Sequence, residues 1–184
     1  MEKCRMVLSG SGGQGVITAA IVIAEAAVLH EGLIAVQSQV YGPEARGGAA
    51  RSDVIISESQ INYPKVIQPN ILVCLTQAAY DKFSPSIRPG GLLLTDTKHV
   101  KTNPKVDARQ IELPMYQTVM DEIGKSIVFN ICMVGAVLAL TNLIKPESIT
   151  KVLADRIPAD VLEMNRKALE LGITLAKTAG FRVL

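Results

Sequence analysis

A glycine-rich turn near the start of the chain constrains the fold more than any other feature. The apolar run of residues 6–8 meets the pattern Gly10-x-Gly12-x-x-Gly15, and an alanine-rich segment follows at once. Glycine lets the backbone approach a ligand closely, and a helix N-terminus adds a partial positive charge. A strand, such a turn and a helix in this order are typical of the first βα unit of a dinucleotide-binding fold.

The same turn leaves two functions open. A conventional NAD site has an acidic residue about 20 residues further on, which holds the ribose. We expect the second strand at residues 33–38, and neither its end nor the following Gln39 supplies a carboxylate, so NAD is disfavoured. The glycines either cradle a different phosphate or serve only tight turning and helix–strand packing. The candidate cofactor-binding or partner-facing residues are Gly10, Gly12, Gly13, Gln14 and Gly15.

The composition excludes several classes of protein and site. A net charge of +2 gives no electrostatic case for binding nucleic acid. The three cysteines lie far apart and the chain has only two histidines, so the usual spacing of a zinc or iron–sulfur site is absent. We expect a cytoplasmic protein, because unpaired cysteines suit a reducing compartment and residues 1–5 lack the apolar region of a signal peptide.

The order of strands and helices predicts the fold class. Further strands are expected at residues 51–57, 71–75, 92–95 and 106–113, with early helices at 14–31 and 76–83. The later chain is mainly helical, with helices at residues 115–123 and 126–143, and two more that begin at Pro146 and Pro158. This pattern predicts an α/β fold in one domain over residues 1–184. The expected architecture is a doubly wound, mostly parallel, Rossmann-like sheet with extra helices at the C-terminus.

Residues 126–144 form an apolar stretch close to the roughly 20 residues that span a bilayer. A membrane span is disfavoured, because it would leave the surrounding globular α/β pattern without cover. We expect a buried helix instead, in which Gly135 and Ala136 allow a neighbouring helix to approach closely.

No pair of nucleophile and base can be recognised. Neither His30 nor His99 has a carboxylate at a motif spacing, and we expect both to be helix-end or loop residues without a catalytic role. Arg51 and Asp53 are close enough in sequence to form a local ion pair, which would contribute little at an exposed site.

The second notable segment is a polar, glycine-punctuated stretch at residues 37–53. Long ordered loops in compact domains are usually functional. Pro43 stiffens this loop, so Arg46 can present its planar guanidinium to a carboxylate or phosphate. The alternative is a structural pair between Arg46 and Glu44 that braces the loop. The candidate anion- or partner-contacting residues are Tyr41, Glu44, Arg46, Gly47 and Gly48.

Together, the two motifs resemble the gamma subunit of the 2-oxoacid:ferredoxin oxidoreductases, which is related to the gamma domains of the pyruvate/ketoisovalerate oxidoreductases. The resemblance covers almost the whole chain. It rests on Gly-Ser-Gly-Gly-Gln-Gly-Val at residues 10–16, on Gln-Val-Tyr-Gly-Pro-Glu-Ala-Arg-Gly-Gly-Ala-Ala-Arg-Ser-Asp-Val-Ile-Ile-Ser at 39–57, and on Ile-Asn-Tyr-Pro at 61–64. We call residues 41–48, Tyr-Gly-Pro-Glu-Ala-Arg-Gly-Gly, the arginine loop. Its sequence looks like that of the 2-oxoglutarate or indolepyruvate branches, since the pyruvate branch more often carries a variant of this loop.

The resemblance implies an accessory subunit of a larger enzyme. Such enzymes convert a 2-oxoacid, here expected to be 2-oxoglutarate, and coenzyme A to an acyl-CoA and CO₂, and pass two electrons to ferredoxin. Thiamine diphosphate with Mg²⁺ would lie between the alpha and beta subunits, and iron–sulfur clusters in other chains, such as a delta-type subunit. This chain would bind none of these cofactors by itself, would be inactive in isolation, and would help to close the coenzyme A side of the site. The alternative is a free-standing nucleotide-binding or regulatory module.

Overall fold

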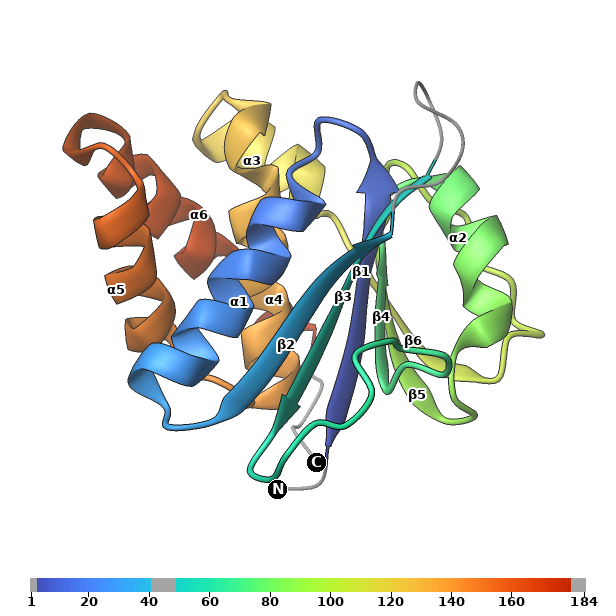
Figure 1. Ribbon diagram of the computed structural model, residues 1–184. Helices are drawn as coiled ribbons and strands as arrows, with labels where there is room; N and C mark the ends of the chain where they lie inside the picture. The colour runs from blue at the N-terminus through green and yellow to red at the C-terminus, as the bar shows by residue number, and fades with distance from the viewer. Residues whose placement is uncertain (1–2, 41–48, 180–184) are drawn as a thin grey trace.

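The computed structural model describes residues 3–40 and 49–179, which form one six-stranded sheet with helices on both faces (Figure 1). The strands are β1 (Cys4–Ser11), β2 (Ile34–Val40), β3 (Ala49–Ser57), β4 (Ile71–Cys74), β5 (Gly91–Asp96) and β6 (Ala108–Leu113). The helices are α1 (Val16–His30), α2 (Gln77–Phe83), α3 (Met115–Glu122), α4 (Phe129–Thr141), α5 (Pro146–Arg156) and α6 (Ala159–Thr178), with short 3₁₀ turns η1 (Ser84–Ser86) and η2 (Ser126–Val128).

The strand order is β2-β3-β1-β4-β5-β6, and β1, β4, β5 and β6 are parallel neighbours. The strand β3 is antiparallel to both β1 and β2, so five of the six strands share one direction. The prediction of a mostly parallel α/β sheet is therefore confirmed, with one reversed strand that the sequence pattern did not reveal. Only residues 41–48 join β2 to β3, and a parallel crossover needs a dozen residues or more.

Alternate side chains of each strand enter different cores, as the two-residue period of a strand requires. On β1, Met6 and Leu8 pack with α1 and α4, whereas Val7 packs with α2 on the opposite face. The larger core lies on the face that carries α1, α3 and α4, and α5 and α6 form an outer layer over α1 and α4 (Figure 1). The alanine-rich α1 is thus buried between the sheet and a second helical layer, as its apolar composition predicts.

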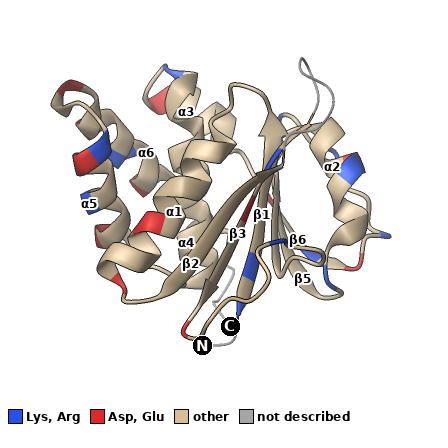
Figure 2. Ribbon diagram, viewed as in Figure 1, with Lys and Arg blue, Asp and Glu red and all other residues tan. Residues whose placement is uncertain are grey.

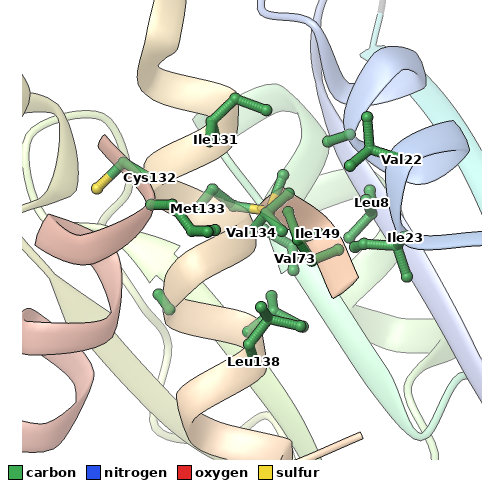
Figure 3. Close-up of a cluster of buried hydrophobic side chains, with 14 of the residues drawn as sticks. Leu8, Val22, Ile23, Val73, Ile131, Cys132, Met133, Val134, Leu138 and Ile149 are labelled. Carbon is green, nitrogen blue, oxygen red and sulfur yellow. The ribbon is translucent and has the colours of Figure 1, made fainter. Parts of the chain in front are cut away.

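The helix α4 is the most deeply enclosed helix among the described residues. Figure 3 shows its side chains packed toward residues of β1, β4, α1 and α5, with Met133 and Val134 near Leu8 and Val73. A side chain at Gly135 would collide with the carbonyl oxygen of Leu169 on α6. The predicted close approach of a neighbouring helix at Gly135 is therefore confirmed.

The prediction of a single helix over residues 126–143 is wrong in its bounds. The chain first forms the 3₁₀ turn η2, and α4 then ends at Thr141 because Asn142 adopts a left-handed conformation with φ of 49°. No helix within residues 3–40 and 49–179 is both long enough and apolar enough to cross a membrane.

Candidate functional site

The glycine turn lies at the carboxyl end of β1 and connects this strand to α1. Gly13 and Gly15 have φ angles of 90° and 70°, a left-handed region that residues with a side chain rarely adopt. A Cβ atom at Gly12 or Gly13 would meet no atom within 4 Å, so this part of the turn is open to the outside. These two positions are therefore the ones that a ligand or partner can approach most closely.

Gly10 and Gln14 have a structural task in the same turn. The side-chain Oε1 of Gln14 accepts a hydrogen bond of 2.8 Å from the backbone N–H of Ser11. A Cβ atom at Gly10 would collide with this oxygen, so glycine is needed for the Gln14 side chain to fold back. Two of the five predicted residues of the turn thus shape it.

Asn130, in the first turn of α4, completes the site, and no sequence motif indicated it. Its Nδ2 donates a hydrogen bond of 3.2 Å to the carbonyl oxygen of Gly15, across 115 positions of sequence. A Cβ atom at Gly15 would lie 2.5 Å from that nitrogen, so glycine is required there as well. The side chain of Asn130 is only 7% exposed, and its Oδ1 has no hydrogen-bond partner among the described residues.

This contact brings the N-termini of α1 and α4 together at the glycine turn. No side chain caps either helix, and neither has an acidic residue in its first turn. The first N–H groups of an α-helix have no partner within the helix itself, although the N–H of Phe129 in α4 donates to Ser126 O of η2, and both helix dipoles place partial positive charge here. The arrangement favours an anion or another hydrogen-bond acceptor.

The position of the glycine turn in the sheet also favours a binding site at this turn. The strands β1 and β4 are neighbours, but α1 follows β1 on one face of the sheet and α2 follows β4 on the other (Figure 1). In α/β proteins, ligands generally bind at the carboxyl ends of the strands beside a reversal of this kind. The glycine turn lies at the carboxyl end of β1, next to this reversal.

The prediction that the arginine loop contacts an anion or a partner is not tested, because its candidate residues lie outside the described residues. These are Tyr41, Glu44, Arg46, Gly47 and Gly48. The two ends of the loop are placed, however. Ala49 pairs with Ser11, and Val40 pairs with Arg51, which itself pairs with Ser9. Both ends of the loop therefore reach the sheet beside the glycine turn, although the two motifs are about 30 residues apart in sequence.

The predicted ion pair between Arg51 and Asp53 forms, and it does not lie at an exposed site, so the low contribution expected of an exposed pair does not apply. The guanidinium binds the carboxylate through two hydrogen bonds, 2.6 Å from Nε to Oδ1 and 3.0 Å from Nη2 to Oδ2. Asp53 is only 2% exposed. It also accepts a hydrogen bond from the backbone N–H of Val66, and Arg51 donates to the carbonyl oxygen of the same residue. The pair thus fastens residues 58–70 to the sheet.

The expectation that neither histidine has a carboxylate partner is wrong. At the end of β5, the ring Nδ1 of His99 lies 3.0 Å from Oδ1 of the fully buried Asp96. The other carboxylate oxygen accepts a hydrogen bond from the backbone N–H of Tyr116, in the first turn of α3. The spacing of three residues after an apolar strand could have indicated this pair. His30 lies in the last turn of α1, as expected, with its Nε2 buried.

The cysteine thiols are poor nucleophiles. Burial raises the pKa of Cys4 to about 11 and that of Cys74 and Cys132 to about 12. All three are free thiols. Within residues 3–40 and 49–179, no group of three or more histidine, cysteine or acidic side chains is placed to hold a metal ion.

Comparisons with known proteins identify the family. Residues 5–175 match the pyruvate ferredoxin/flavodoxin oxidoreductase family. The chain is 46% identical over 172 residues to the 2-oxoglutarate synthase subunit KorC of Methanocaldococcus jannaschii, which covers 92% of each protein. It also matches the crystal structure of a keto/oxoacid ferredoxin oxidoreductase gamma subunit from Geobacter sulfurreducens with a TM-score of 0.89 and 38% identity, over 97% of this chain and 99% of that one.

A third match shows the same fold within a longer protein. The 2-oxoglutarate:ferredoxin oxidoreductase of Magnetococcus marinus aligns with a TM-score of 0.87 and 24% identity, over the whole of this chain and 33% of that one. The two motifs, the fold and the extent of these matches lead to one conclusion: the chain belongs to the pyruvate ferredoxin/flavodoxin oxidoreductase family.

Proposed function

We propose that this chain is the gamma subunit of a 2-oxoglutarate:ferredoxin oxidoreductase and consists of a single gamma domain. The observation that carries the proposal is the 46% identity with a 2-oxoglutarate synthase subunit, which extends over nearly the full length of both proteins. The complex oxidatively decarboxylates 2-oxoglutarate with coenzyme A, which yields succinyl-CoA and CO₂. The two electrons released in this oxidation go to ferredoxin. The comparisons support this subunit role over the free-standing nucleotide-binding module.

The redox chemistry belongs to the partner subunits in this proposal. Thiamine diphosphate with Mg²⁺ and the iron–sulfur clusters are held by the alpha, beta and delta-type chains, in the cytoplasm. The described part of this chain offers unreactive thiols and no cluster of metal ligands, which fits a supporting subunit. Such a chain acts on the reaction by binding and positioning, and is inactive in isolation.

The glycine turn and the arginine loop form the working edge of the subunit. The support is geometric: two uncapped helix N-termini meet at Gly15, and both ends of the arginine loop reach the sheet beside the same turn. Coenzyme A carries phosphates, which suit such an edge. The Magnetococcus marinus enzyme was solved with coenzyme A bound. We propose that the coenzyme A side of the complex lies at this edge, with Gly12 and Gly13 offering close backbone approach and with Arg46 acting as a contact to an anion.

Affinity purification from the native source tests the subunit role. A tagged chain should recover partner subunits together with thiamine diphosphate and iron, and the preparation should reduce ferredoxin only when both 2-oxoglutarate and coenzyme A are present. A chain that elutes alone, without partners that carry thiamine and clusters, contradicts the proposal.

Calorimetry separates the subunit from the free-standing module. The isolated chain is titrated with NAD, FAD, ATP and coenzyme A in turn. Micromolar binding of NAD or FAD would contradict the subunit role, because neither takes part in the proposed reaction.

A further inference from the structure

A pocket of about 460 Å³ lies at the amino end of β1, the opposite end of that strand from the glycine turn. We call it the basic pocket. It is lined by Arg5, Tyr63, Lys65, Ile67, Gln68 and Arg88. The amino end of β1 is coloured blue for basic residues in Figure 2. The sequence motif at residues 61–64 supplies part of its wall through Tyr63, and the working edge described above leaves this motif without a role.

The basic pocket carries positive charge that the described chain does not neutralise. Three of its six lining residues are cations and none is a carboxylate. The side chains of Arg5, Lys65 and Arg88 form no ion pair with any residue in the described part of the chain. Like charges gathered around one hollow repel one another, so a bound anion would relieve an unfavourable arrangement.

Apolar side chains flank these cations. Tyr63 is 57% exposed and Ile67 is 70% exposed, so two large side chains with apolar surface lie beside the cations of the same pocket. Tyrosine and arginine are among the side chains enriched in protein–protein interfaces, because each offers a broad contact surface and a polar group. A small inorganic anion would use the cations alone, whereas a protein segment would use both kinds of side chain.

The loop that supplies this wall is held in place from beneath. Val66 is buried between the exposed Lys65 and Ile67, and its backbone N–H and carbonyl group bind the buried pair of Asp53 and Arg51. Further hydrogen bonds fasten both sides of the pocket, from Ser38 Oγ to Pro64 O, from Arg5 N to Asn70 Oδ1 and from Arg88 N to Pro69 O. A surface formed before binding loses little conformational entropy when a partner docks.

We propose that the basic pocket is the docking surface for an acidic segment of a partner subunit in the same complex. Carboxylates of that segment pair with Arg5, Lys65 and Arg88, and an apolar side chain of the segment packs against Tyr63 and Ile67. The inference rests on the proposed subunit role. It gives the two ends of β1 separate tasks, since one end docks on a partner while the other presents the glycine turn.

Charge reversal in the native complex tests the inference. The double variant Lys65→Glu/Arg88→Glu is compared with Lys151→Glu/Lys177→Glu, which changes the net charge equally at exposed positions of α5 and α6. We expect the first variant to recover about tenfold less partner subunit per tagged chain at a fixed salt concentration, because it sets like charges against each other. The second should recover as much as the parent. Circular dichroism melts check that both variants are folded.

Carbodiimide crosslinking of the parent complex supplies an independent readout. The reagent joins a lysine to a carboxylate only when they are in direct contact, so Lys65 should appear in a linked peptide with an aspartate or glutamate of a partner subunit. Links from Lys65 only within its own chain, or undiminished recovery by the Lys65→Glu/Arg88→Glu variant, would overturn the inference and leave the subunit role intact. A parent chain that recovers no partner overturns both.

Discussion

The guanidinium of Arg51 binds the carboxylate of Asp53 through two hydrogen bonds. The pair is largely buried, since the side chains of Arg51 and Asp53 are 15% and 2% exposed. The guanidinium also lies over the ring of Phe83 in α2, 5.4 Å from its centroid. Because the same two residues bind the backbone of Val66, the pair connects three parts of the chain: β3, α2 and the loop that supplies the basic pocket.

Arg51→Ala should lower the free energy of unfolding by about 3–5 kcal/mol, because it leaves a buried carboxylate without its partner. Urea denaturation followed by circular dichroism measures the change. Arg166→Ala is the matched control, since Arg166 is 44% exposed and its nearest carboxylate, on Glu163, is 3.7 Å away. The control should shift stability by less than about 0.5 kcal/mol. Equal stability of Arg51→Ala and the parent would contradict this account.

Glu31 should make stability depend on pH. Its carboxylate accepts hydrogen bonds from Ser148 Oγ at 2.6 Å and from the backbone N–H of Lys145 at 3.0 Å, where α5 begins. These bonds, that from Ser148 foremost, hold the pKa of Glu31 below its usual value. A carboxyl group with a lowered folded-state pKa stabilises the protein above its unfolded value of about 4.3, and this contribution is lost as the pH falls through the folded value.

Glu31→Gln should therefore be less stable than the parent at pH 7, and the difference should shrink as the pH falls below about 4.3. Thermal melts from pH 7 to pH 3 measure it. Glu170→Gln, at an exposed position of α6, should behave as the parent does throughout. If the difference in thermal stability between Glu31→Gln and the parent were independent of pH, the charge of the carboxylate would have no part in that difference.

The thiols should resist modification in the folded chain. Burial raises the pKa of Cys74 and Cys132 to about 12, so both remain protonated thiols at pH 8, and both are buried. A disulfide reagent that forms a coloured thiolate should react slowly with the native protein. In denaturant it should react quickly with all three cysteines. Fast labelling of either buried cysteine in the native protein would contradict the packing of β4 or α4.

Arg46→Ala should lower kcat/KM of the reconstituted complex by about one to two orders of magnitude, the effect of a lost charge-assisted hydrogen bond of roughly 1.5–3 kcal/mol. Arg46→Lys keeps the charge but loses the two-pronged geometry, so it should also weaken turnover. Steady-state kinetics with coenzyme A and 2-oxoglutarate varied separately measure this, with assembly checked by gel filtration. If the Arg46→Ala complex fails to assemble, Arg46 is an interface residue. If it assembles and turns over normally, the loop is structural.

Local signals in the sequence predicted most of the elements, because they act within a few residues. Gly32 follows the end of α1, Gly124 follows α3 with φ of 75°, and Pro146 opens α5. Helix starts and ends depend on backbone conformations that glycine and proline favour or forbid, so these positions can be read without knowledge of the tertiary structure.

Contacts between distant segments could not be read in this way. The direction of β3 depends on where the chain goes after β2, and the hydrogen bond from Asn130 to Gly15 joins the first and second halves of the chain. The burial of Asp53 depends on α2 and on residues 58–70, which cover it only in the folded protein. Sequence spacing identified the glycine turn of the candidate site but not the side chain that holds it.

Reconstitution of the complex with and without this chain tests the proposed function most directly. The alpha, beta and delta-type subunits are assembled, and the reduction of ferredoxin is followed with 2-oxoglutarate and coenzyme A. Turnover should depend on coenzyme A, be lost when this chain is omitted, and return when the chain is added back. Equal turnover by the complex that lacks the chain would contradict the proposed function.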